Sequence, residues 1–144
     1  MRQAQRLKST IGRKPILLRF NPEARWVLSA GIFADETHLA VLNLAGEIKS
    51  RATFPTEVHR GPEAVFRSFA ANARDLLVQE DIAIDKVLGV GVAIEGIVDS
   101  AAGELKYSVR FAWRDVPVKQ HVEAALGIAT LVQSDGQAMA MGEY

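Results

Sequence analysis

Residues 86–94 read KVLGVGVAI, a short and almost wholly apolar run in which Lys86 carries the only charge. The run is far too short to cross a bilayer, which requires about 20 apolar residues. A continuous apolar run of this length is typical of a strand that is covered on both faces of a sheet. We therefore expect residues 86–94 to form a central strand with other elements packed on each side.

The residues ahead of this strand predict an antiparallel group. Stretches that are β-branched, or that alternate between apolar and polar residues, are separated by short breaks at Ala34-Asp35-Glu36 and at Ala45-Gly46. Connections this short join antiparallel neighbours. The predicted strands are residues 25–33, 37–43 and 47–54, with ILLRF at residues 16–20 as a further short strand before them.

Helical periodicity appears on both sides of the central run. Gly61-Pro62 opens a first helix, because proline suits the first helical turn, and Asp115 is expected to cap a second helix. This second helix begins at Val116-Pro117 and stops at Gly127. The apolar face of the first helix consists of Val65, Phe66, Phe69, Ala73, Leu76 and Leu77.

The end of the chain predicts one more strand and one more helix. ATLVQ at residues 129–133 is a second buried strand, and DGQAMAMGEY at residues 135–144 begins a helix. Three antiparallel strands followed by right-handed crossovers into parallel ones give an α/β fold with one mixed sheet of about five strands and helices on its faces. This order predicts one lobe of a ribonuclease-H-like, actin-like ATPase fold.

The formal net charge of zero conceals two parts of opposite sign. Of the 17 Lys and Arg residues, six lie in the first 19 residues, where no acid occurs; this leaves 11 bases against 17 acids in the remainder. An acidic body repels a polyanion and is a poor nucleic-acid binder by itself. Residues 1–14 combine basic and small polar residues, so we predict a basic linker there and a folded lobe over residues 15–144.

Several function classes are excluded or disfavoured by residue content. The chain has no cysteine, so it has neither a disulfide framework nor a thiolate zinc site. No apolar segment resembles a membrane span or a signal peptide, and we expect a cytoplasmic protein with no membrane partner. His38, His59 and His121 show no metal-ligand spacing, so a structural or solvated role is expected for each and no metal site is predicted.

Four blocks of sequence resemble the ROK family, whose members are repressors, open reading frames and sugar kinases. STIGRKPILLRFNPEA at residues 9–24 resembles the segment that joins a winged helix to the sugar-binding domain in the repressor branch. The family's usual Pro-Gly turn corresponds to Glu95-Gly96. The other matching blocks are GVGVAIEGIVD (89–99), LKYSVRFAWRDVPV (105–118) and VQSDGQAMAMGEY (132–144).

The phosphate loop of the kinases is degenerate in this chain. The resemblance implies an Asp-x-Gly-x-Thr loop that approaches ATP phosphates and magnesium, and the aligned residues are Gly31-Ile32-Phe33-Ala34-Asp35. Gly31 stands at the carboxylate position and Phe33 at the tight-turn glycine, so close backbone approach to phosphate is blocked. Asp35 could replace the missing acid, although an exposed hairpin turn is its more ordinary role.

The resemblance also implies a sugar site formed by Gly96, Arg110, Trp113, Ser134 and Asp135. Arg110 replaces an Asn and either favours an anionic sugar or is simply solvated. Trp113 either walls the site or packs in the interior. Ser134 replaces another Asn. Asp135 is kept; it would accept hydrogen bonds from a sugar hydroxyl, act as the base in a kinase, or cap the final helix.

These features favour a sugar-responsive transcriptional regulator over an enzyme. The resemblance implies the N-terminal lobe of the sugar-sensing domain of a ROK-type repressor, with a winged helix that reads DNA and a second lobe both outside these residues. No cofactor is expected in this chain, and the family's zinc would belong to the second lobe. The implied partners are a small sugar and further copies of the chain. The alternative is an ATP-dependent sugar kinase that uses Asp135 as its base.

Overall fold

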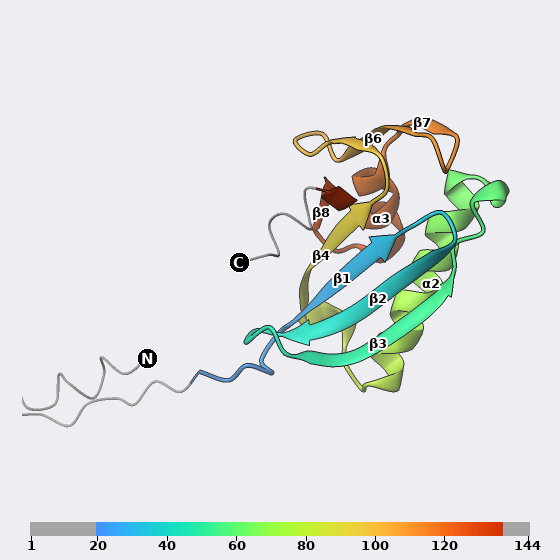
Figure 1. Ribbon diagram of the computed structural model, residues 1–144. Coiled ribbons are helices and arrows are strands. Elements are labelled where there is room, and N and C mark those ends of the chain that lie inside the picture. Colours follow the sequence, from blue (N-terminus) through green and yellow to red (C-terminus); the bar gives the residue numbers. More distant parts are fainter. Residues whose placement is uncertain (1–19, 137–144) are drawn as a thin grey trace, which may run out of the picture.

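A five-stranded mixed sheet forms the body of the protein in the computed structural model, which describes residues 20–136 (Figure 1). The strand order is β3-β2-β1-β4-β8; β1 pairs antiparallel with β2 and parallel with β4, and β4 pairs parallel with β8. This confirms the predicted fold class. The strands are β1 (Trp26–Ile32), β2 (Glu36–Asn43), β3 (Ile48–Pro55), β4 (Val87–Ile94) and β8 (Thr130–Ser134).

Two helices cover one face of this sheet. The first, α2 (Pro62–Gln79), begins with its proline in the first turn as predicted, and the second, α3 (Val118–Leu126), ends at Gly127 with a left-handed φ of 71°. Phe66 and Phe69 of α2 are almost fully buried against the sheet. Their burial matches the predicted apolar face, and each aromatic side chain contributes roughly 1.5–3 kcal/mol of hydrophobic stabilisation. Two short 3-10 turns, η1 (Val58–Arg60) and η2 (Ile84–Lys86), flank α2.

The opposite face of the sheet is uncovered by the described residues. Side chains of β4 alternate between buried and exposed rather than being buried throughout, and Leu88 is 57% exposed. On the neighbouring strand β8, Leu131 is 75% exposed. We expected residues 86–94 to be covered on both faces. Within the described residues 20–136 this is wrong, because α2 and α3 both lie on the same side of the sheet. β4 is an interior strand, and β1 is the middle one.

A second, smaller sheet lies beyond the carboxyl ends of β1 and β4 (Figure 1). Its three antiparallel strands, in the order β5-β6-β7, are β5 (Ile97–Asp99), β6 (Glu104–Ser108) and β7 (Trp113–Val116). These strands carry little sequence pattern, because they are short and their burial is uneven. Leu105, Trp113 and Val116 of this sheet are buried in the same core as α2 and α3.

The predicted helix cap at Asp115 is wrong. The residue before α3 is Pro117, which has no side-chain cap, whereas Asp115 belongs to β7 and has a φ of 54°. Its carboxylate lies 3.4 Å from Lys106 Nζ. Hydrogen bonds to Glu104 and Asp115 raise the pKa of Lys106 above its ordinary value. Residue 115 still belongs to strand β7, so its carboxylate lies beside Lys106 of the neighbouring strand β6 and does not cap the first turn of α3.

Several predictions fall on residues that the structure does not describe. These are the basic linker at residues 1–14, most of the strand at residues 16–20, and the final helix after Gly136. Phe20 itself is not in a strand, while Asp135 and Gly136 have helical backbone. Over residues 20–136, no helix has both the length and the apolarity needed to span a membrane.

Candidate functional site

The parallel strands β1, β4 and β8 end at one edge of the large sheet, which we call the carboxyl edge. Ligands of open α/β sheets bind beyond such an edge, where loops from several strands meet. The predicted site residues come from these loops: Phe33 and Asp35 follow β1, Gly96 follows β4, and Asp135 follows β8. Topology thus unites positions that lie about a hundred residues apart in the sequence.

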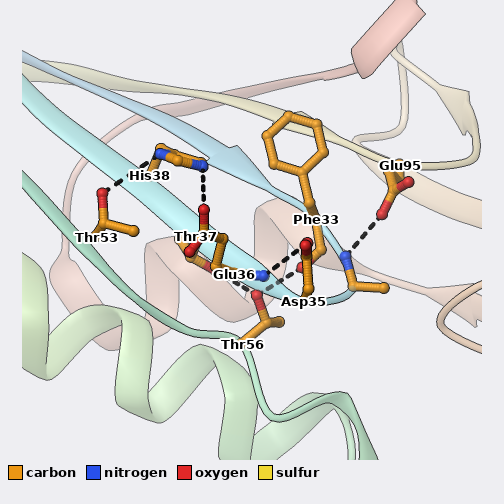
Figure 2. A network of polar contacts seen from close by, with 9 residues as sticks. Phe33, Asp35, Glu36, Thr37, His38, Thr53, Thr56 and Glu95 are labelled. Carbon is orange, nitrogen blue, oxygen red and sulfur yellow. Dashed lines mark hydrogen bonds and ion pairs between the residues drawn. The ribbon is translucent and has the colours of Figure 1, made fainter.

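The turn between β1 and β2 uses its backbone N–H groups within the protein (Figure 2). Phe33 N donates to Glu36 O at 3.1 Å, and Glu36 N donates to the Asp35 carboxylate at 2.9 Å. Ala34 N donates to Glu95 Oε1 at 2.7 Å. Phosphate-binding loops require backbone N–H groups that point at the ligand. These three groups already have acceptors, and the Asp35 carboxylate accepts from the residue that follows it in the hairpin turn.

Two buried threonines hold this turn from β2 and from the end of β3. Thr56 Oγ1 donates to Phe33 O at 2.6 Å, and the hydroxyls of Thr37 and Thr56 are 2.8 Å apart. Because the Thr56 hydroxyl proton goes to the carbonyl, Thr37 is the donor in the second bond. Both threonines are almost fully buried. Satisfied buried polar networks rigidify their surroundings, so opening the turn would leave buried hydroxyls unpaired.

The side chain of Phe33 lies against Gly31. A Cβ atom on Gly31 would come within 3.0 Å of Phe33 Cε2, and the Phe33 ring also makes an edge contact with His38 at 5.9 Å between ring centroids. The Cβ atom of an acid at position 31, which the kinase motif requires, would be in tight contact with this ring, and the ring would have to shift. The two departures from the motif fit each other physically, since the small residue leaves room for the large one.

Glu95 is a site residue that the sequence analysis missed. Its two carboxylate oxygens contact different segments: Oε1 accepts from Ala34 N, and Oε2 lies 3.2 Å from Arg110 Nη1. The Glu95 side chain is only 18% exposed. One feature of the sequence could have identified Glu95 as a site residue: it is an acid at the position of the proline in the family's Pro-Gly turn. The Arg110 side chain is 60% exposed and forms an ion pair with Glu95. Neither role predicted for Arg110, anion binder or solvated residue, included this internal partner.

Gly96 has a structural role that only glycine can fill. Its φ is 138°, and a Cβ atom there would lie 2.6 Å from Tyr107 O and 2.7 Å from Leu105 Cδ1. Residues with a side chain rarely adopt this φ, and the approach leaves no room for one. Gly96 thus allows β5 to turn back onto β6, whether or not a ligand contacts it.

Trp113 is packed in the interior, in agreement with the second of its two predicted roles. It is 7% exposed, and the centroid of its ring lies 4.8 Å from the ring centroid of Phe111 and 6.0 Å from that of Phe66. Phe66 is in turn stacked on His121 at 5.2 Å. A side chain with this little exposed surface supports the neighbouring loop that carries Arg110.

Ser134 and Asp135 stand at the end of β8 and are partly exposed. Since the helical backbone starts at Asp135, Ser134 takes the position that precedes the helix, and the Asp135 carboxylate belongs to the first turn. Whether Asp135 binds a sugar hydroxyl stays a prediction. A hollow of about 710 Å³ lies elsewhere, between α2 and α3, and no predicted site residue lines it.

The histidines lie apart in the fold. His38 is in β2, His59 in η1 and His121 in α3. Among residues 20–136, no group of three or more His, Asp or Glu residues is arranged to hold a metal ion. The expectations that this chain binds no cofactor and that zinc belongs to a second lobe are untested and stay predictions.

This five-stranded mixed sheet with its helices is one lobe of an actin-like ATPase fold, and comparison with known proteins specifies the family. The model of the ROK family matches residues 29–144, and the chain belongs to that family. It is 21% identical over 136 residues to the xylose repressor of Caldicellulosiruptor bescii, covering 94% of this chain and 34% of the repressor. The chain spans about a third of the length of the curated relatives it matches.

Solved structures from both branches of the family share the fold. A ROK family transcriptional regulator, described as a homologue of the E. coli MLC protein, superposes with a TM-score of 0.75 at 16% identity, covering 96% of this chain and 35% of the regulator. A ROK family glucokinase from Streptomyces griseus, in complex with glucose and AMPPNP, gives 0.72 at 24% identity, covering 83% and 36%. Both comparisons support the lobe architecture, and the branch is not resolved by them.

Proposed function

We propose that this chain is the sugar-sensing lobe of a ROK-type transcriptional repressor and carries no catalysis. The observation that carries the proposal is the occupied turn after β1: the N–H groups of Phe33, Ala34 and Glu36 all donate within the protein. Catalysis of phosphoryl transfer depends on positioning phosphates and stabilising their charge. A turn in which these three donors are taken, with a phenyl ring beside Gly31, supplies neither.

The carboxylate of Asp135 at the carboxyl edge suits a sugar ligand, because it can accept hydrogen bonds from sugar hydroxyls. Asp135 follows Ser134, which pairs in register with Ile94, two residues before Gly96. The proposal includes a cytoplasmic homo-oligomer that meets DNA through a winged helix outside these residues. A ROK glucokinase is the second candidate, because Asp135 remains where the kinases have their base and a glucokinase shares the fold.

Phosphoryl transfer is the sharpest distinction between the two candidates. We expect no turnover above blank when the chain is incubated with ATP, magnesium and either xylose or glucose, because the occupied turn cannot hold the transferred phosphate. Coupled detection of ADP measures this, with a ROK glucokinase as positive control. ADP formation that requires the sugar and disappears in Asp135→Asn would establish the kinase instead.

Sugar binding by this chain should be weak and confined to the carboxyl edge. Each hydrogen bond contributes about 0.5–1.5 kcal/mol, and the described edge offers few side-chain partners, so we expect a Kd of about 1 mM or weaker. Xylose or glucose is titrated into the protein, and amide chemical shifts are recorded. We expect the shifts of Ser134, Asp135 and Gly96 to change. Asp135→Asn should reduce the shifts, whereas Asp85→Asn in η2 should not. Shifts confined to other surfaces would remove the support for a sugar sensor.

A further inference from the structure

The carboxyl edge contains an anion of its own, the carboxylate of Glu95. One oxygen accepts the Ala34 N–H at 2.7 Å, and the other lies 3.2 Å from Arg110 Nη1. A loop N–H group and a guanidinium are the two kinds of donor that attract a phosphate or carboxylate ligand. Here a single side chain occupies both donors from within the protein (Figure 2 shows its contact with the turn).

The geometry makes this occupation persistent. The Glu95 side chain is 18% exposed, and its backbone N donates to Ile32 O at 3.2 Å, which fixes the residue beside the end of β1. An incoming anion would have to displace a short, largely buried, charge-assisted hydrogen bond. Such bonds are about twice as strong as neutral ones. Glu95 thus stands at the loop N–H where an outside anion would otherwise bind.

The neighbouring charges act in the same direction. Asp35 and Asp135 follow β1 and β8 at the same edge, while Arg110 is already paired with Glu95. An anionic ligand therefore meets two further carboxylates and a guanidinium whose charge is compensated. Like charges in a partly desolvated site repel more strongly than in bulk water.

We infer that Glu95 is a specificity residue that excludes anionic ligands from the carboxyl edge and leaves it open to uncharged sugars. The choice of uncharged sugars rests on the function proposed above, whereas the exclusion of anions rests on the Glu95 contacts alone. Of the two predicted roles of Arg110, the inference rejects the binding of a phosphosugar or a sugar acid, because the guanidinium has an internal partner.

The test is Glu95→Gln in the full chain, with pyrophosphate as an anion that carries no sugar hydroxyls. Glutamine keeps an acceptor for Ala34 N–H but removes the charge that compensates Arg110. We expect the affinity for pyrophosphate to be at least about tenfold higher than in the wild type. Removing one negative charge within about 4 Å of the bound anion has an effect of this size. Amide shifts of Ala34 and of the Arg110 loop report the location.

Matched variants separate local charge from net charge. Glu104→Gln in β6 removes another ion-paired carboxylate, that of the Lys106 pair, and should leave pyrophosphate affinity unchanged. Adding Arg110→Gln to Glu95→Gln should abolish the gain. Equal pyrophosphate affinity in wild type and Glu95→Gln, or an equal gain in Glu104→Gln, would overturn the inference.

Two further measurements keep the outcome decisive. Glu95→Ala removes the acceptor as well as the charge, so it should also gain anion affinity and speed hydrogen exchange at Ala34; no gain in either variant counts against the inference. Glucose 6-phosphate should bind Glu95→Gln more tightly than wild type, while glucose should show little difference. If no sugar shifts Ser134 or Asp135 in any variant, the sensor proposal fails while the anion result stands.

Discussion

Trp113→Ala should destabilise the protein by about 3 to 5 kcal/mol, the usual cost of truncating a buried tryptophan. The indole is 7% exposed and contacts the rings of Phe66 and Phe111, so its removal leaves a cavity between α2 and the second sheet. A loss of this size is a large part of the stability of a small domain. Urea unfolding monitored by circular dichroism measures it.

Phe20→Ala provides the control for this substitution. Phe20 is an aromatic residue outside the strands and about half exposed, so its truncation should change the free energy of unfolding by no more than about 0.5 kcal/mol. Should Trp113→Ala unfold at the wild-type urea concentration yet lose the sugar-induced shifts, the indole would be a wall of the ligand site rather than part of the core.

Gly96→Ala is expected to cost about 2 to 5 kcal/mol, from backbone strain and overpacking together. A methyl group would meet Tyr107 O at 2.6 Å and Leu105 Cδ1 at 2.7 Å, and alanine rarely adopts a φ of 138°. Relief of the contact requires movement of β6 backbone, not merely a side-chain rotation. The midpoint of thermal or urea unfolding should fall accordingly.

Gly91→Ala tests whether the effect is specific to position 96. Gly91 lies in β4 on the uncovered face, and a Cβ atom there would meet nothing within 4 Å. We expect a change within about 0.5 kcal/mol, and in the stabilising direction if the unfolded chain loses entropy. Equal losses at both positions would mean that replacing glycine is costly in general, and the close approach at Gly96 would not be the cause.

The elements carrying a clear period were predictable from sequence. The alternating strands before Pro55, the apolar face of α2 and the stop at Gly127 correspond to the observed elements, with ends shifted by one or two residues. The predicted helix cap at Asp115 is wrong, because an acid shortly before a proline resembles the start of a helix in sequence. Its left-handed φ of 54° and its strand partner Lys106 depend on β6 and β7, whose short strands carry little pattern.

Several positions at the carboxyl edge follow from family motifs, whereas Glu95 and the contacts within the edge do not. Family motifs pointed to Gly31, Phe33, Gly96 and Asp135, and the parallel strands do bring their loops to one edge. The sequence allows two roles for Trp113, because an aromatic residue that is buried and one that lines a site share the same sequence pattern. Its burial became evident only when Phe66 from α2 was placed beside it.

The strands of the large sheet, the helices α2 and α3 and the family are predictable from the amino-acid sequence alone, because periodicity, turn residues and motifs are local properties of the chain. The contacts of Glu95 with Ala34, 61 residues away, and with Arg110, 15 residues away, arise only in the folded protein. The contact between Glu95 and Ala34 follows from the parallel register of β1 with β4, which places the turn after one strand beside the turn after the other. Hydrogen bonds depend on this approach in space, which no local pattern encodes.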